Sequence, residues 1–493
     1  MSSEELTGVV FPALADGRRS TSALGRAVVA DALRAVDPAG ALGAEHETNW
    51  RSGYLVHFRR LIEAGLTSRA AWLATARDGL GSLHARMRVI SPGGDETGLG
   101  SLLTDPAPRS FTTATVQGTG TAEDEFSLPY RGEHLRGDAL ARRLDSWVAA
   151  GIIEPTCADA VRAVAAHPEW LRLPGRTVAV LGAGAEIGPL PVLLGWGARV
   201  AGVDLPHPPL WERVLSTARG TGGTLLVPVA ARGAPGAGDL PGRGGLDLVS
   251  DVPAAADWLA GIGGPLVLGN YVYADGAANV RVSAAVDALT VRLQAARDDV
   301  ALAFLATPTD VFAVGADAVA QSARAYAARS AGAKLAGRPL RTLSGGRLLR
   351  RAYLPGADPG INDSLVAQQG PNYALAKRLQ RWRAALARDG GATVSLNVAP
   401  PTRTRSVVRN RALAAAYAGA HRFGVEVFEP ATCKVLMAAL LVHDLHAGGG
   451  PAHDHPWQDE AYAAATGGLW RIAYAPRSAL GLAALLGYGS ARA

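Results

Sequence analysis

The sequence has few cysteines and no long apolar run. Cys157 and Cys433 are the only cysteines among 493 residues, and two such distant residues make neither a disulfide framework nor a cluster of metal ligands. No uninterrupted apolar stretch is long enough to span a bilayer, and no charged and then apolar leader follows Met1. We therefore expect a cytoplasmic protein without a membrane span.

The sequence also lacks the basic stripe that is typical of nucleic-acid-binding proteins. The formal net charge is +6, but Lys and Arg are scattered and do not alternate with aromatic side chains along one segment. Nucleic acid is therefore not an expected partner. With 48% hydrophobic and 19% charged residues, the chain is expected to be globular, and its length predicts two or three domains.

A glycine-rich turn follows a short apolar run in the segment RTVAVLGAGAEIGPLP. The run from Val178 to Leu181 is typical of a buried parallel strand. The residues expected to approach a cofactor follow it directly: Gly182, Gly184, Glu186, Ile187 and Gly188. Glycine lets the backbone approach a pyrophosphate closely, and a helix that starts near Glu186 would direct unpaired N–H groups at the phosphates. The pattern predicts a nucleotide site.

Asp204 ends the next predicted strand, which runs from Arg199 to Val203. An acidic residue about 20 positions beyond the first glycine is where a Rossmann unit binds the hydroxyls of the adenosine ribose. Because a carboxylate would repel a 2′-phosphate, Asp204 predicts a preference for NAD(H) over NADP(H). The same logic also suits the adenosine of S-adenosylmethionine.

Tyr373 and Lys377 lie four residues apart in GPNYALAK, so they project from one face of the predicted helix. A positive charge near a phenol favours the phenolate and lowers the pKa from its usual value near 10. We therefore expect Tyr373 to exchange protons as an acid and base, with Lys377 in support.

Short apolar runs alternate with Ala-rich helical windows through the same part of the chain. The runs expected as further strands are Leu225–Val229, Leu246–Val249, Pro265–Leu268 and Ala301–Ala306. This βαβ rhythm predicts an α/β fold with a doubly wound parallel sheet, Rossmann-like, over residues 176–445. Asn270 and Thr307 would then converge with the glycine-rich turn at the carboxyl ends of the strands.

Residues 1–175 lack this alternating pattern and are expected to form an additional, mainly helical region of unknown role. Apolar residues recur at helical spacing in 23–35 and 50–76, and short β-prone runs follow at 86–90 and 111–116. Two more helices are expected beyond residue 138, with breaks at Gly151 and before Pro155.

Two further segments flank the predicted catalytic helix. Residues 311–363 form an insertion with a helix over 317–334 and a basic, Gly-rich continuation, which we interpret as a lid over the substrate. Residues 446–493 form a C-terminal tail. Four histidines cluster around its start, His443, His446, His453 and His455, but with no cysteine among them we expect a polar loop and no metal site.

Taken together, the glycine-rich turn and the Tyr-x-x-x-Lys helix resemble the short-chain dehydrogenase/reductase superfamily. The resemblance implies that Tyr373 is the acid/base and that Lys377 holds the nicotinamide ribose. It also implies that Thr393–Val398 is a strand and that Thr404, in the APPTRT that follows it, approaches the nicotinamide carboxamide. Asn270 is the counterpart of a family asparagine.

Two positions depart from the pattern of that superfamily. Glu186 stands where the family has its middle glycine, and Gly360 stands where it has its catalytic serine. Ser364 is the nearest hydroxyl in sequence and is the preferred catalytic candidate, with Thr309 as the alternative.

The sequence therefore predicts an NAD(P)(H)-dependent oxidoreductase that interconverts a carbonyl and an alcohol on a small molecule. A homo-oligomer is one possible state of assembly. Two alternative functions stay open. One is an S-adenosylmethionine-dependent transferase, and the other is a catalytically inactive nucleotide-binding regulator or scaffold.

Overall fold

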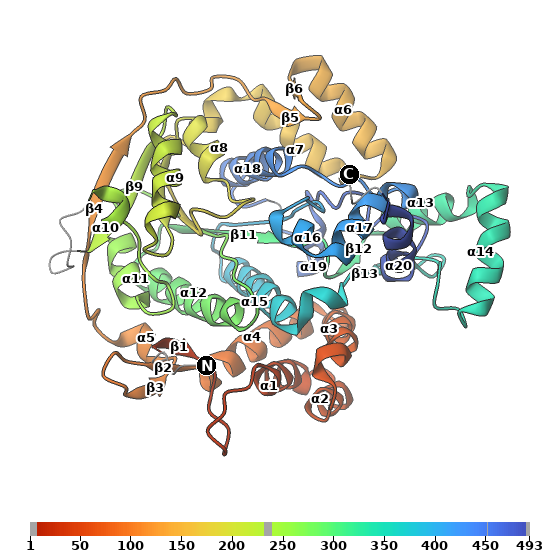
Figure 1. Cartoon of the computed structure of the whole chain (residues 1–493), viewed down its shortest axis with the longest axis horizontal. Helices are drawn as coiled ribbons and strands as arrows, with labels where there is room; N and C mark the ends of the chain where they lie inside the picture. Colours follow the sequence, from red (N-terminus) through yellow and green to blue (C-terminus); the bar gives the residue numbers. More distant parts are fainter. Residues whose placement is uncertain (1–6, 231–238, 451, 490–493) are drawn as a thin grey trace.

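A seven-stranded sheet runs through the centre of the computed structural model, which describes residues 7–230, 239–450 and 452–489 (Figure 1). Six strands are parallel, and β4 at one edge is antiparallel to β9. In spatial order the strands are β14 (Val394–Val398), β11 (Val300–Ala306), β10 (Leu266–Asn270), β7 (Thr177–Leu181), β8 (Arg199–Val203), β9 (Thr224–Ala230) and β4 (Phe111–Gln117). Counted along the chain from β7, the parallel strands follow the order 3-2-1-4-5-6 in reverse, which is compatible with a Rossmann-like fold.

Helices cover both faces of this sheet, so its central strands are buried on both sides (Figure 1). On one face Val178 and Val180 pack in a core with α7 (Pro155–Ala166), α8 (Leu190–Gly195), α9 (Pro208–Arg219) and α18 (Pro430–His446). On the other face Ala179 and Leu181 pack in a core with α11 (Val252–Ala260), α12 (Ala277–Ala296) and α15 (Gly370–Asp389). The alternation of side chains along each strand separates these two cores.

The N-terminal helices form a further layer against α15. They are α1 (Thr21–Arg34), α2 (Pro38–Glu45), α3 (Trp50–Gly65) and α4 (Arg69–Arg86). A small antiparallel sheet lies beside them, with β1 (Gly8–Val10), β2 (Arg88–Ile90) and β3 (Glu96–Gly98), and α5 (Ser101–Thr104) follows. Gly79 of α4 lies so close to Trp382 of α15 that a Cβ on this glycine would lie 2.3 Å from the indole.

Residues before and after position 175, the expected end of the N-terminal region, contribute to the same central sheet and to the helices that cover it. β4 joins the main sheet, and the predicted helices before Gly151 and after Glu154 are α6 (Gly137–Ala150) and α7. Gly151 ends α6 with a φ of 72°, a left-handed conformation that suits glycine. Two short strands, β5 (Leu128–Tyr130) and β6 (Glu133–Leu135), form the remaining hairpin of this region.

The prediction of a strand at Leu246–Val249 is wrong. After α10 (Leu240–Arg243), the backbone N–H of Leu246 donates to the carbonyl of Asp204, and the chain then turns. The Asp247 carboxylate accepts a hydrogen bond from the N–H of Val249, and this local bond competes with strand pairing. The apolar run is buried, but it leads directly into α11.

The insertion begins and ends in a pair of antiparallel strands. β12 (Val311–Val314) pairs with β13 (Gly360–Asp363), so Val311 lies opposite Asp363 at its base. The single predicted helix of this segment is two helices, α13 (Ala316–Ala327) and α14 (Ala331–Leu343). Part of the basic, Gly-rich continuation is therefore helical, with Pro339 inside α14.

The C-terminal part of the chain packs on the body. After β14 come α16 (Arg405–Arg409) and α17 (Arg411–Gly419), and the tail contains α19 (Pro456–Ala461) and α20 (Pro476–Gly487). α17 and α20 pack closely, since a Cβ on Gly419 would lie 2.0 Å from the carbonyl oxygen of Ala483. Trp470 of the tail is buried in the same core as α15. Three 3-10 turns complete the described elements, at Pro168–Arg172, Ala367–Gln369 and Ala420–Phe423.

Candidate functional site

The loops after β7 and β10 meet where the order of the strands reverses. β7 is followed by β8 on one side and lies beside β10 on the other. Gly182, with a φ of +90°, approaches the loop after β10 so closely that a Cβ would lie 2.9 Å from the carbonyl oxygen of Tyr271. Any larger residue would push the two loops apart. Ligands of open α/β sheets bind outside the carboxyl ends of the strands at such a reversal, so the candidate site is here.

Asp204 connects the end of β8 with the glycine-rich turn. One oxygen of its carboxylate accepts from the N–H of Gly184 at 2.8 Å, and the other accepts from the N–H of Leu205 at 2.8 Å. Burial raises the pKa of Asp204, although these two backbone bonds act in the opposite direction. Each carboxylate oxygen can accept a second hydrogen bond. Asp204 therefore braces the turn and keeps acceptor capacity for a hydroxyl group.

The helix after the turn differs from the prediction. The sequence predicts a start near Glu186, but α8 begins at Leu190 and has six residues. Pro189 and Pro191 flank its start, and proline has no N–H to donate to a phosphate. The N–H groups of Ala185 and Gly188 bond within the turn. Compared with the sequence prediction, fewer donors of this turn are available to a pyrophosphate.

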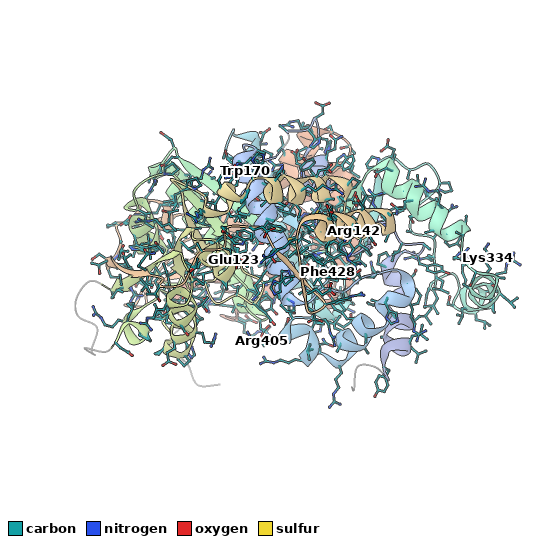
Figure 2. All side chains as sticks on the ribbon, turned by 90° about the horizontal axis from the view of Figure 1, so that it is seen from above. Glu123, Arg142, Trp170, Lys334, Arg405 and Phe428 are labelled. Atoms are coloured by element: carbon teal, nitrogen blue, oxygen red, sulfur yellow. The ribbon has the colours of Figure 1, made fainter. Side chains whose placement is uncertain are left out.

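Glu186 joins the glycine-rich turn to the segment after β14. Its carboxylate accepts from the backbone N–H of Arg405 at 3.0 Å and lies 3.6 Å from the Arg405 guanidinium. This guanidinium is largely exposed. The contact directs the carboxylate of Glu186 toward Arg405, the first residue of α16, so a neighbouring cation offsets the negative charge in the turn. Arg405 is labelled in Figure 2.

Ile187 and Gly188 follow Glu186 at the end of the glycine-rich turn. Ile187 lines a cavity of about 10 Å³ together with Tyr271 and Phe304, on the face of the sheet that α18 covers. A cavity of this size holds roughly one water molecule. Gly188 lies against the turn itself, where a Cβ would meet the side chain of Ala185 at 3.3 Å.

Lys377 and Asn270 are linked by a buried glutamine. The Lys377 ammonium donates to the carbonyl oxygen of Leu305 at 3.1 Å and to Oε1 of Gln380 at 3.2 Å. The amide of Gln380 donates to Oδ1 of Asn270 at 3.3 Å. Burial lowers the pKa of Lys377 to about 8. Within the described residues, these bonds leave one of the three ammonium N–H groups for a ligand.

Tyr373 faces Thr307, the residue that follows β11. Burial raises the pKa of Tyr373, while the hydrogen bond with Thr307 acts in the opposite direction. The ring also contacts Tyr273 edge to face, at 6.2 Å between centroids. The expected lowering of the Tyr373 pKa by Lys377 is wrong, because Lys377 is engaged with Leu305 and Gln380 and burial dominates. The phenol is neutral at pH 7 and can donate a proton.

The candidate hydroxyls lie in two places. Thr309 hydrogen bonds with Thr307 at 2.9 Å between their hydroxyl oxygens, so it extends the contact with Tyr373. Ser364, the preferred candidate from the sequence, donates instead to Oδ1 of Asn362 at 2.5 Å, and its backbone N–H donates to Asp310. The hydroxyl that contacts Tyr373 is therefore that of Thr307, which sequence spacing did not favour.

Thr404 precedes α16, next to the residue that binds Glu186. Its hydroxyl lies 3.0 Å from that of Ser406, and its side chain is partly exposed. Thr404 therefore lies next to the residue that contacts the glycine-rich turn, but its hydroxyl is engaged in a local contact.

Two buried polar clusters beside the site were missed by sequence reasoning. In one, Ser395 and Asn397 of β14 both donate to Asp444 of α18, at 2.7 and 2.9 Å. The signal was present, since polar residues at alternate positions of a buried strand need a partner. In the other, Asp310 pairs with Arg378 at 2.8 Å and with Arg381 at 2.7 Å.

The four histidines near the tail make separate contacts. His443 lies 3.3 Å from Asp444, and His446 stacks on Trp170. His453 lies 2.8 Å from Asp459, and His455 caps α19. Among the residues that the structure describes, no three His, Cys, Asp or Glu side chains gather in a way that could hold a metal ion.

No protein-family model, curated protein or solved structure matches the chain. Of the helices in the described ranges, none combines the length and apolarity that crossing a membrane requires.

Proposed function

We propose that the chain is an NAD(H)-dependent oxidoreductase of the short-chain dehydrogenase/reductase type, with a doubly wound, Rossmann-like domain. The observation that carries the proposal is the contact between Tyr373 and Thr307, with Lys377 one helical turn further on and the glycine-rich turn at the same edge of the sheet. A phenol, a hydroxyl and an ammonium at this edge form an acid/base group beside a candidate nucleotide site.

The residues around the turn fit an adenine nucleotide. Gly182 allows close approach of the two loops, and Asp204 has acceptor sites left for the ribose hydroxyls. A nicotinamide cofactor would supply the hydride that the side chains cannot. Asp204 would disfavour a 2′-phosphate, so we propose NAD(H) over NADP(H).

The protonation state of Tyr373 suits the role of a proton donor. Since its pKa is raised, the phenol keeps its proton at neutral pH and can donate it to the oxygen of a carbonyl substrate. Thr307 would orient the phenol and the substrate oxygen. Lys377, with a pKa near 8, is mostly protonated at pH 7 and would bind a ribose hydroxyl with its remaining N–H. We therefore propose Tyr373 as the proton donor in carbonyl reduction.

A specific observation supports the second candidate, an S-adenosylmethionine-dependent transferase. The Lys377 ammonium already has two partners within the protein, and the adenosine-binding features, the turn and Asp204, do not depend on it. A nucleotide-binding regulator without catalysis would share these features.

A titration with NADH separates the candidates. We expect enhanced NADH fluorescence on binding, weak competition by S-adenosylmethionine and weaker binding of NADPH. Tyr373→Phe should retain NADH binding within a few fold and lose carbonyl reduction, while Tyr462→Phe, in the tail and outside the candidate site, serves as the matched control. Tighter binding of S-adenosylmethionine than of NADH would refute the proposal, and so would unchanged turnover by the Tyr373→Phe variant.

A further inference from the structure

Helix α14 projects from the body of the molecule at the end of the insertion (Figure 1). One of its sides faces the protein. Gly337 is buried, and a Cβ on it would meet Leu349 at 3.6 Å. Arg341, one turn later, donates to the hydroxyl of Tyr326 on α13. Positions 337 and 341 therefore mark the inner side of the helix.

The outer side of α14 is apolar. Leu335, Pro339 and Leu343 are spaced by four residues, so they form one line along the helix. This line is offset by two positions from Gly337 and Arg341, which places it away from the body. The side chain of Leu335 is 76% exposed and that of Leu343 is 86% exposed. A surface helix of a globular protein normally turns its apolar face inward, so these leucines are unexplained by the packing.

The apolar line is flanked by positive charge. Lys334 and Arg338 precede Leu335 and Pro339 in the sequence, and both are exposed. Lys334 lies at the outermost end of the molecule (Figure 2). The whole stretch between Asp317 and Asp358 contains no acidic residue, and its cations are Arg324, Arg329, Lys334, Arg338, Arg341, Arg347, Arg350 and Arg351.

We propose that the outer face of α14 docks on a bilayer surface that contains anionic phospholipids. Exposed leucines beside Lys and Arg on one helix are the pattern of an interfacial helix, whose apolar side enters the boundary of the acyl chains while its cations meet the headgroups. Because α14 projects from the body of the molecule, its outer side can reach a broad, deformable surface (Figure 1). A second copy of the chain is a poor occupant, because like charges on the two arms would repel each other.

The docking is expected to be weak and to need both the exposed leucines and the neighbouring cations. Two leucines offer little apolar area, and the electrostatic attraction falls within a Debye length. The full chain should sediment with vesicles of phosphatidylcholine and phosphatidylglycerol at about 0.1 M salt. The bound fraction should fall at least about fivefold on vesicles of phosphatidylcholine alone, or at about 0.5 M salt.

Paired variants separate the apolar and the electrostatic contributions. Leu335→Ser with Leu343→Ser should lower binding at least about fivefold, and Lys334→Gln with Arg338→Gln should lower it roughly two- to fivefold. The matched control is Leu42→Ser with Val56→Ser, which removes two exposed apolar side chains from α2 and α3. Control and test variants should melt at similar temperatures, since these positions are on the surface.

Three outcomes would overturn the proposal. The first is no sedimentation of the full chain with anionic vesicles. The second is binding that persists in the Leu335/Leu343 variant, with equal binding to soluble polyglutamate, which would indicate an acidic protein as the partner. The third is a dimer by light scattering that the same variant abolishes, which would indicate a second copy.

A site-specific label reports the depth of the helix. Both native cysteines are buried, and burial raises the pKa of the Cys433 thiol to about 11 and that of Cys157 further. Leu343→Cys would therefore be labelled selectively by a polarity-sensitive dye. The dye emission should shift to shorter wavelength on adding anionic vesicles. A label at Val56→Cys should not shift, and equal shifts at both positions would contradict docking through α14.

Discussion

Helices α15 and α14 are both rich in Ala, Leu and Arg, and they lie close together in the sequence, yet their environments are opposite. α15 buries Arg378 and Arg381 almost completely, whereas α14 exposes Lys334, Arg338 and its leucines. The difference is in the neighbouring acids. α15 faces Asp310, Glu460 and Asp287, while no acid occurs in the sequence around α14 between Asp317 and Asp358.

The comparison shows that burial of a cation is decided by its partner and not by the helix that presents it. An unpaired charge inside the protein would cost several kcal/mol, by order of magnitude, so a cation without a carboxylate stays in water. Lys377 of α15 is the intermediate case. It is partly buried, its contacts are neutral, and its pKa is lowered to about 8.

The largest expected effect comes from breaking the buried pairs of α15. Asp310→Asn leaves Arg378 without its carboxylate and removes one of the two carboxylates of Arg381. We expect the free energy of unfolding to fall by about 3–5 kcal/mol, measured by denaturant titration. Asp16→Asn, which disrupts the exposed pair with Arg18, is the control and should change it by less than about 1 kcal/mol. Similar effects of the two changes would contradict the comparison.

A second test concerns Asp287, which pairs with Arg383 of α15 at 2.7 Å and contacts His84 at 2.6 Å. Burial alone would raise the pKa of Asp287, but Arg383 and His84 overcome it and hold the pKa well below its usual value of 3.8. The pair therefore stabilises the fold above about pH 4, and this stabilisation is lost as the pH falls below that value.

Acid titrations of the wild type and of Asp287→Asn would measure this contribution. The wild type should lose stability steeply below about pH 4, while the variant, already weakened at pH 7, should show a shallower dependence there. Asp145→Asn, at an exposed pair with Arg162, should leave the slope unchanged. Parallel curves for the wild type and Asp287→Asn would rule out this assignment.

The sequence predicted the elements with regular patterns and missed those that depend on distant partners. β7, β8, β10, β11 and α15 follow from apolar runs and helical spacing. Two missed features depend on side-chain hydrogen bonds. Leu246–Val249 turns because the Asp247 carboxylate accepts from the N–H of Val249, and Thr307 reaches Tyr373 because α15 packs against β11. Spacing along the chain could rank Ser364 but could not show that its hydroxyl bonds to Asn362.

The third test uses Lys377, whose pKa lies below the ordinary 10.5 of a lysine. The folded state releases this proton before the unfolded state does, so the folding stability should rise with pH between about 8 and 10.5. Lys377→Met removes the titrating group while keeping the length of the side chain, and it should abolish that rise. Calorimetric melting between about pH 7 and 10.5 would show this, and Lys434→Met, on α18, is the control. A rise of equal size in Lys377→Met would assign it to another group.

The smallest effect is expected on α14, and it tests the other side of the comparison. Lys334 and Arg338 are exposed, so Lys334→Gln with Arg338→Gln should change the free energy of unfolding by no more than about 0.5 kcal/mol. The change should be slightly stabilising at low salt, because the removed charges repel the other cations of this segment, and it should vanish at about 0.5 M salt. Denaturant titrations at both salt concentrations would measure it. A loss above about 1 kcal/mol would mean that Lys334 and Arg338 have partners within the protein, and the contrast with α15 would then not hold.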